Sequence, residues 1–278
     1  MSYERAHDRL RTVLEERDGE NPDDPMSVQA MPLVLHLPHD PRPLRRDVLE
    51  AAAVACVSLC LDDRAGVELR AESGTGPGPE SEPEEAAVAS ALMRWYGARI
   101  RKVARRARNK KWSDVQSLPG VTATVGTASV RAFAPCPVTE TPAAINRLQI
   151  EGVDLPLPAD AESVTAGDEH PVIYVDASLG MSVGKAAAQV AHGSMLLAAA
   201  MDRDRAREWR AAGFPLHVCE VDAQRFADRR AAAEQRERDG AGGRVAHRGH
   251  RDSAAVVHDA GYTEVAPGAV TVVSLDRG

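Results

Sequence analysis

The last 110 or so residues alternate short apolar runs with longer segments of mixed polarity. Four apolar runs are typical of buried strands, and two longer segments predict helices, the first of which Ser182 can cap. The strands are expected at residues 171–176, 216–221, 254–257 and 270–275, and the helices at residues 183–203 and 223–239. The order strand–helix–strand–helix–strand–strand predicts an α/β domain around a mixed sheet.

The first half of the chain shows a related pattern. Strands are expected at residues 32–37, 121–125 and 130–133, and helices at residues 45–61 and 84–110. The long second helix would carry Leu92, Tyr96, Val103 and Ala107 on one side. We therefore predict an α/β fold for this half as well.

A gapless comparison places part of the first half on the second. With a shift of 139 residues, residues 32–59 lie on residues 171–198, so that strand meets strand and helix meets helix. Arg46 then meets Lys185, Glu50 meets Gln189 and Ala53 meets His192. Two interpretations stay open: a chance alignment of two strand–turn–helix units, or an internal duplication whose first copy has lost its polar residues.

The length of 278 residues suits one large domain or two of ordinary size. Residues 73–83 are rich in Pro, Gly and Ser and predict a loop, whereas residues 152–170 have neither helical nor strand periodicity and predict a linker. The expected organisation is an N-terminal helical or flexible segment, an N-terminal α/β half, a linker and a C-terminal domain, at residues 1–30, 31–150, 151–170 and 171–278.

Composition excludes several classes of protein. The N-terminus is charged throughout and predicts no signal peptide, and no run of about 18 apolar residues predicts a membrane span. The four cysteines form no CxxC pair and no zinc-type spacing, so we expect neither a metal site nor a disulfide framework. Cys56 and Cys60 are expected as small buried side chains, and we predict a cytoplasmic location.

The net charge of −7 hides a strongly basic run at residues 99–111, which has eight Lys or Arg residues and no acid. These are Arg99, Arg101, Lys102, Arg105, Arg106, Arg108, Lys110 and Lys111. The run fits the solvated face of a helix, or a surface that follows a phosphate backbone. A second basic run lies at residues 244–251.

Two short segments carry candidate chemistry. In a helix, Lys185, Gln189 and His192 lie at i, i+4 and i+7 and so share one face, with Lys185 in the first turn where anions are favoured. Residues 259–263 (DAGYT) follow a predicted strand, and ligands of α/β sheets bind at strand ends. The stripe also fits an ordinary core face, and DAGYT an ordinary turn.

Together these segments resemble the type 2 peptidyl-tRNA hydrolase family over about residues 171–275. The matching residues are Gly184, Lys185, Ala187, Ala188, Gln189, His192, Asp259, Ala260, Gly261, Thr263, Pro267, Gly268 and Thr271. The resemblance implies a mixed four-stranded sheet flanked by helices, often dimeric, acting on peptidyl-tRNA without a metal or other cofactor. The first half would then be a degenerate copy of this fold.

The sequence departs from the family at four positions, three cationic and one flexible. Gly180 stands where a further lysine is usual, Tyr262 replaces an arginine, and Ser182 and Val183 replace glycine and lysine. The departures imply either a different way of holding tRNA or weak activity.

The resemblance implies roles for five residues. Asp259 would orient or deprotonate the attacking water, and Lys185 would stabilise the oxyanion or hold a phosphate or ribose. Thr263 and Gln189 would donate neutral hydrogen bonds, and His192 would act as a buried orienting group or as an acid or base.

The predicted function is therefore hydrolysis of the ester between a peptide and tRNA, with the basic run at residues 99–111 as the tRNA-binding surface. A catalytically inactive RNA-binding protein that keeps the fold is the main alternative, and hydrolysis of another ester or amide is a third. The expected state is a monomeric pseudo-dimer, in which the first half replaces a second subunit, or a homodimer.

Overall fold

The computed structural model describes residues 2–15, 19–21, 23–69, 83–150, 155–156, 169–241, 253–261 and 264–276. The helices are α1 (Ser2–Arg11), α2 (Arg45–Cys60), α3 (Pro83–Gly97), α4 (Asn109–Val115), α5 (Ala143–Asn146), α6 (Val183–Ala200), α7 (Arg203–Ala211) and α8 (Ala223–Ala241). The strands are β1 (Gln29–His36), β2 (Lys102–Ala107), β3 (Gly120–Val125), β4 (Ala128–Phe133), β5 (Cys136–Pro137), β6 (Val172–Asp176), β7 (His217–Val221), β8 (Ala254–His258) and β9 (Val270–Leu275). In this part of the chain, no helix is long and apolar enough to cross a membrane.

Each half of the chain contains one mixed sheet, and the two sheets share one strand order. The N-terminal sheet runs β2-β1-β4-β3, with the short β5 added to β1, and the C-terminal sheet runs β7-β6-β9-β8. In both sheets the first pair is parallel and the other two pairs are antiparallel. The prediction of an α/β fold with a mixed four-stranded C-terminal sheet is confirmed.

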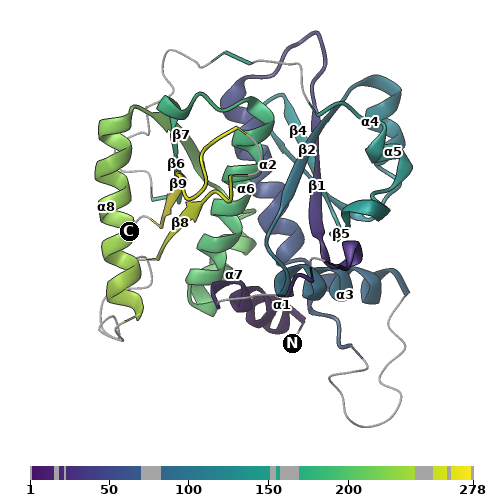
Figure 1. Ribbon diagram of the computed structural model, residues 1–278, viewed down its shortest axis with the longest axis horizontal. Coiled ribbons are helices and arrows are strands. Elements are labelled where there is room, and N and C mark those ends of the chain that lie inside the picture. The colour runs from purple at the N-terminus through teal and green to yellow at the C-terminus, as the bar shows by residue number, and fades with distance from the viewer. Residues whose placement is uncertain are drawn as a thin grey trace.

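The two halves pack through their first long helices. Helices α2 and α6 lie side by side between the sheets, while α8 covers the far side of the C-terminal sheet and α4 and α5 cover the far side of the N-terminal one (Figure 1). The molecule is thus layered as α8, C-terminal sheet, α2 with α6, N-terminal sheet, then α4 with α5.

Alternation along the central strands supports this layering. In β6, Ile173 and Val175 face the central helices, whereas Val172 and Tyr174 face α8. A β-strand turns successive side chains to opposite faces, so a strand covered on both sides must be apolar at every position. This is why residues 171–176 have no polar alternation before their last residue.

Three buried polar contacts join the halves across the central helices. Arg45, at the start of α2, donates two hydrogen bonds to Glu220 of β7 through Nε (2.8 Å) and Nη2 (2.9 Å), and a third to the carbonyl of Met181 (2.9 Å). Ser194 of α6 donates to the carbonyl of Ala53 (2.8 Å), and Glu50 accepts from the amide of Val218 (3.1 Å). Because small residues line α2 and α6, the two helix backbones can approach closely.

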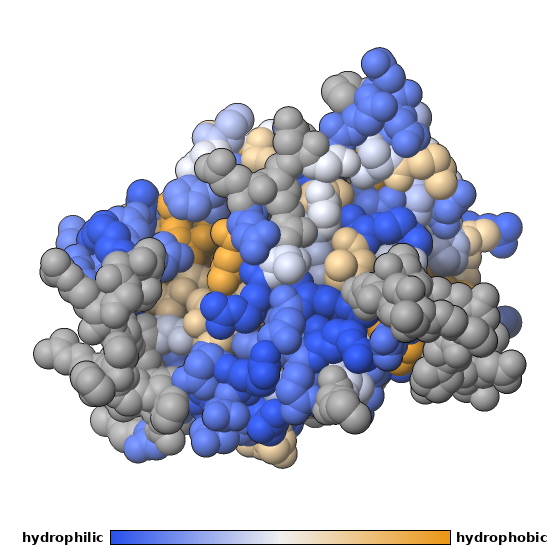
Figure 2. All heavy atoms as spheres, turned by 90° about the horizontal axis from the view of Figure 1, so that it is seen from below, coloured by the Kyte–Doolittle hydropathy of each residue, from blue (hydrophilic) through white to orange (hydrophobic). Residues whose placement is uncertain are grey.

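Helix α1 also packs at the interface between the two halves. Tyr3 donates to the carbonyl of Arg203 (3.0 Å), and a ring nitrogen of His7 lies 3.1 Å from the carbonyl of Ala198. Arg203 and Arg207 of α7 pair with Asp8 and Glu4 of α1. The face on which α1 and α7 lie is mainly hydrophilic (Figure 2).

One predicted helix is wrong. Residues 84–110 do not form a single helix: α3 ends at Gly97, and residues 102–107 form the edge strand β2, parallel to β1. The apolar positions Ile100, Val103, Ala104 and Ala107 fit helical spacing, but Ile and Val favour strands and Gly97 is a poor helix residue. The basic run is therefore mainly an edge strand.

Candidate active site

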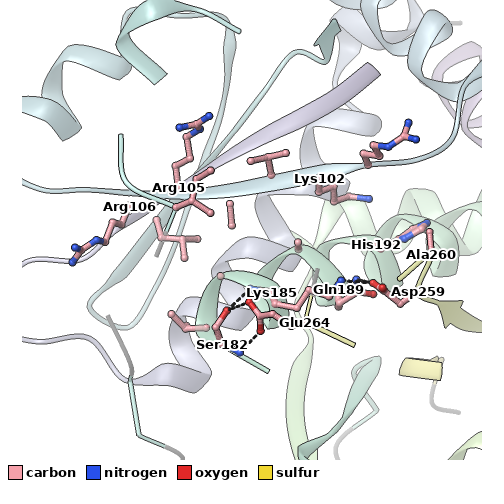
Figure 3. A pocket seen from close by; sticks show the side chains of 18 of the residues that line it. Lys102, Arg105, Arg106, Ser182, Lys185, Gln189, His192, Asp259, Ala260 and Glu264 are labelled. Carbon is pink, nitrogen blue, oxygen red and sulfur yellow. Dashed lines mark hydrogen bonds and ion pairs between the residues drawn. The ribbon is translucent and has the colours of Figure 1, made fainter. Parts of the chain in front are cut away.

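A cleft of about 910 Å³ lies between the two halves. One wall comes from the C-terminal half, namely the start of α6 and the loop that follows β8. The other wall comes from the N-terminal half, chiefly residues 100–106 with Leu35, Leu37, Val138 and Ile150. In Figure 3 the labelled side chains of β2 lie across from Lys185, Gln189 and Asp259.

The start of α6 is fixed by its cap. Ser182 accepts a hydrogen bond from the amide of Lys185 (3.2 Å), as the predicted N-cap requires. The amide and hydroxyl of Ser182 in turn donate to the two carboxylate oxygens of Glu264, at 2.8 and 2.6 Å. Glu264 thus ties the loop between β8 and β9 to the end of the helix that carries Lys185.

The loop after β8 closes on itself around Asp259. The amide of Asp259 donates to the carbonyl of Ala269 (2.9 Å), and its carbonyl accepts from the amide of Gly268 (2.7 Å). Gly261 has a φ of 78°, and a Cβ there would lie 2.4 Å from Pro267, so only glycine fits this turn. The matched residues Asp259, Gly261, Pro267 and Gly268 therefore build one compact turn that fixes the carboxylate.

Four polar side chains form a continuous network at the floor of the cleft. Lys185 pairs with Oδ2 of Asp259, which also accepts a hydrogen bond from Gln189 (2.7 Å). The amide oxygen of Gln189 accepts from Thr271 of β9 (2.7 Å), and Oδ1 of Asp259 accepts from the amide of Gly261 (2.7 Å). The side chains of Lys185 and Asp259 are only 11% and 6% exposed, so little solvent screens this pair.

Lys185 has more N–H donors than this network uses. An ammonium group has three N–H donors, and among the described residues only Asp259 takes one of them. Because Lys185 lines the cleft, the remaining donors are available to a ligand there. Gln189, by contrast, uses its amide on Asp259 and Thr271, which fits a positioning role better than a direct contact with a ligand.

His192 lines the cleft one turn beyond Gln189. Burial and, next, the charge of Lys102 lower the pKa of His192 well below its usual value. Lys102 reaches it from the opposite half: its Nζ lies 3.1 Å from the sulfur of Met195 and 4.9 Å from the centre of the Trp95 ring. Burial lowers the pKa of Lys102 as well. His192 is therefore a neutral imidazole near neutral pH.

The basic run divides between the cleft and the outer surface. Arg101, Lys102, Arg105 and Arg106 line the cleft, whereas Arg106, Arg108, Lys110 and Lys111 line a second hollow of about 300 Å³ at the other end of β2. Arg99, whose side chain is 58% exposed, lies 3.8 Å from Glu20, which also pairs with Arg101. Basic side chains thus line both hollows, and Arg106 is common to the two.

Two arginines of β2 hold the cleft wall itself. Arg105 donates to the carbonyls of Asn146 (3.0 Å) and Leu148 (2.9 Å), and Arg106 donates to the side chain of Gln149 (2.5 Å). The amide of Arg106 also bonds the carbonyl of Gln149 (2.9 Å). These contacts fix residues 146–149 along the edge of β2 and so place Ile150 at the mouth of the cleft.

Two of the departures from the family pattern have local causes. Gly180 adopts a left-handed conformation with a φ of 60°, which glycine tolerates far better than lysine. Val183 is 4% exposed and packs in the central core, where a lysine would lose its hydration. Tyr262 and the predicted site residue Thr263 lie outside the described residues, as do residues 244–251.

Three features of the cleft were not predicted from sequence. Thr271 was matched to the family without a role, yet it orients Gln189, and Glu264 anchors the cap of α6. The apolar wall from the N-terminal half depends on long-range packing and has no local sequence signal. Within the described part of the chain, no group of three or more His, Cys, Asp or Glu side chains is placed to hold a metal ion.

The C-terminal half is thus an α/β domain with a buried ammonium–carboxylate pair at the end of a strand. Residues 170–241 match the family described as peptidyl-tRNA hydrolase PTH2, so the C-terminal region contains a PTH2 family domain. The match includes Lys185, Gln189 and His192 and ends before Asp259. No curated protein matches the chain.

Proposed function

We propose that the protein hydrolyses the ester that joins a peptide, or an N-blocked aminoacyl group, to tRNA. The PTH2 family domain supports this class of reaction. The proposal assigns the chemistry to residues 171–278, tRNA contacts to residues 31–150 and the link between them to residues 151–170. The two halves then act as one unit, a monomeric pseudo-dimer working in the cytoplasm.

The observation that carries the proposal is the buried contact between Lys185 and Asp259 at the floor of the cleft. The two residues come from different elements, 74 positions apart in the chain, and both side chains are almost fully buried. Burying charges costs several kcal/mol per ion, and such a pair contributes little net stability compared with apolar residues. A buried pair that faces a cleft of this size is therefore better explained by chemistry than by folding.

The geometry supports a simple division of work. Asp259 orients a water molecule whose oxygen attacks the carbonyl carbon of the ester, and a proton of that water passes to the departing ribose oxygen. The free donors of Lys185 stabilise the negative charge that develops on the carbonyl oxygen, in a site with little water. Gln189 and Thr271 hold Asp259 in place, and His192 fills the adjoining wall as a neutral ring.

The basic surface along β2 supports the choice of tRNA as the leaving group. The six residues of this strand span about 20 Å at the usual rise of a strand. A chain of phosphates that ends in the cleft would leave it along β2 and reach Lys110 and Lys111, which line the hollow at the other end of the strand. In this proposal, basic residues of the N-terminal half contact tRNA in place of the cations that are missing at Gly180 and Val183 of the C-terminal half.

A direct test uses release of free tRNA from N-acetyl-aminoacyl-tRNA. Lys185→Ala should lower kcat by about 100- to 1,000-fold, because it removes one oxyanion donor. Arg46→Ala is the matched control, since Arg46 stands at the position equivalent to Lys185 in the first half, and it should leave kcat unchanged. A Lys185→Ala protein that is folded and fully active would rule out the assigned role.

The tRNA contact is tested by the salt dependence of KM. Replacing Lys110 and Lys111 together by Gln should raise KM and reduce the slope of log KM against log salt by about 1 to 2, with kcat little changed. Arg225 and Arg230 of α8, on the opposite side of the molecule, form the control pair for the same substitution. An unchanged slope in the Lys110/Lys111 variant would exclude phosphate binding there.

A catalytically inactive RNA-binding protein is the second candidate. It is favoured by the left-handed Gly180 and the buried Val183, which leave no cation at two positions where the family usually has one. The same assay separates the candidates, because this protein would bind N-acetyl-aminoacyl-tRNA without releasing free tRNA.

A further inference from the structure

We infer that the N-terminal half forms an apolar subsite in the cleft, which binds the side chain of the amino acid esterified to tRNA. The inference rests on the proposed function and extends it, because it makes the enzyme selective for substrates whose last residue is large and apolar. The selecting residues, Val138 and Ile150, lie outside the PTH2 family domain at residues 170–241.

The wall opposite Lys185 is built from aliphatic side chains. Leu35, Leu37, Ile100, Val103, Val138 and Ile150 line the cleft on this side. Val138 and Ile150 are 45% and 57% exposed, and they are two of only five large apolar residues that are exposed in the described part of the chain. Isolated exposed apolar residues are ordinary, but two at the mouth of one aliphatic cleft indicate a binding surface.

The aliphatic wall lies close to the proposed reaction centre. A Cβ placed on Gly184, next to Lys185, would lie 3.7 Å from Cβ of Ala104 and 3.7 Å from the carbonyl oxygen of Ile150. The wall therefore approaches the first turn of α6, and the substituents of a carbonyl carbon held by Lys185 and Asp259 would lie in the same cleft as this wall. Arg105 and Arg106 fix the segment before Ile150, so the wall is set before a ligand arrives.

The aliphatic wall is better suited to the amino-acid side chain than to the terminal base of tRNA. Proteins hold single-stranded bases by stacking on aromatic rings or arginine planes and by polar contacts to base edges. Among the described residues that line the cleft, the aromatic rings are those of His192 and His258, both on the wall of the C-terminal half. On the opposite wall Arg105 and Arg106 are engaged with residues 146–149. Aliphatic side chains instead match the apolar side chain of an amino acid.

The test measures binding and turnover separately. One tRNA acceptor stem is prepared with N-acetyl-leucine or N-acetyl-glycine in a non-hydrolysable 3′-amide linkage, and dissociation constants are measured. The leucyl form should bind about 10-fold more tightly or better, since each methylene in an apolar pocket contributes this order of selectivity. The double variant Val138→Ser/Ile150→Ser should bring the ratio close to one without changing affinity for the glycyl form.

The control is Leu14→Ser, which removes an apolar side chain that is 50% exposed and does not line the cleft, and it should keep the leucyl preference. Equal affinity of the wild type for the two amides would overturn the subsite. An equal loss of affinity for both amides in the double variant would also overturn it, because the wall would then hold the terminal base. If the preference holds but the corresponding esters are not cleaved, the proposed function fails and the subsite stands.

Discussion

The two halves of the molecule share a strand order but differ at the point where chemistry would occur. In the C-terminal half, eleven residues separate β8 from β9, and they carry Asp259 back to Lys185 and Gln189. In the N-terminal half, β3 and β4 are joined by Gly126 and Thr127 alone, and the helix carries Arg46, Glu50 and Ala53 at the matching positions. The two halves thus share a strand order but not this arrangement of polar side chains.

The shared topology supports the hypothesis of an internal duplication. The gapless shift of 139 residues places β1 and α2 on β6 and α6, and both pairs occupy the same places in their sheets. In the first half, polar residues of α2 contact the other half. Arg45 and Glu50 are both directed at β7 of the other half, where they bind Glu220 and the amide of Val218. Its polar residues now join the halves together.

Among changes at the interface between the halves, replacing Arg45 should have the largest effect on the free energy of unfolding. Arg45→Met leaves Glu220 buried and unpaired and should lower the free energy of unfolding by about 3–5 kcal/mol, measured by urea denaturation. The double variant Arg45→Met/Glu220→Leu should recover most of this loss. Arg207→Gln is the surface control, with an expected change of about 0–1 kcal/mol. A loss below 1 kcal/mol in Arg45→Met would show that the pair does not join the halves.

A smaller effect should follow at Gly193, whose counterpart in α2 is Val54. A Cβ on Gly193 would lie 2.6 Å from Oγ of Ser274 and 2.9 Å from a methyl group of Val272, so α6 packs closely on its sheet. Gly193→Ala should lower thermal stability by about 1–3 kcal/mol, although alanine favours helix. Gly97→Ala, where nothing lies within 4 Å of the added carbon, should not destabilise the protein. A stabilised Gly193→Ala protein would contradict the close packing of α6.

The pH dependence of stability distinguishes Glu50 from its counterpart Gln189. Burial raises the pKa of Glu50, so folding disfavours its ionised form. Protonated Glu50 therefore contributes to the free energy of unfolding. This contribution is complete below the ordinary pKa of about 4.3 and is lost as the pH rises through the raised pKa of the folded state. Glu50→Gln should remove this loss, so that the variant gains stability over the wild type as pH increases, measured by denaturant unfolding across that range. A constant difference between the two proteins would contradict the shift.

The smallest effect on hydrolysis is expected from giving α2 the three polar residues of α6. Arg46→Lys, Glu50→Gln and Ala53→His together should add no hydrolysis, because the two-residue turn between β3 and β4 supplies no equivalent of Asp259. The variant is assayed in an Asp259→Asn background, where any new activity is visible. Measurable release of tRNA above that background would show that the loop is not required.

Much of the fold followed from the sequence because strand and helix periods were clear in the second half. The strand at residues 270–275 matches β9 at both ends, and α2 and α6 begin where their patterns predict. The failure at residues 84–110 has a physical cause. β2 lies at the edge of its sheet, where arginine can point to solvent, so its pattern is not the alternation of a half-buried strand.

The site was predictable only in part. The family resemblance placed Lys185, Gln189 and Asp259 together, and the structure adds their contacts. No local pattern could show that β2 forms the opposite wall, because that depends on how α2 packs against α6. The prediction that residues 99–111 hold tRNA stays a prediction, now with Lys102 and Arg106 in the cleft and Lys110 and Lys111 outside it.

The central claim is that the chain has one working site, at Asp259. The most direct measurement is kcat/KM for release of tRNA from N-acetyl-aminoacyl-tRNA by the wild type, Asp259→Asn and Asp47→Asn. Asp47 is the matched control, since it lies beside the turn between β3 and β4 and accepts a hydrogen bond from Thr127. We expect Asp259→Asn to lower kcat/KM by about 100- to 10,000-fold and Asp47→Asn to change it less than about twofold. Wild-type activity in a folded Asp259→Asn protein would contradict the account.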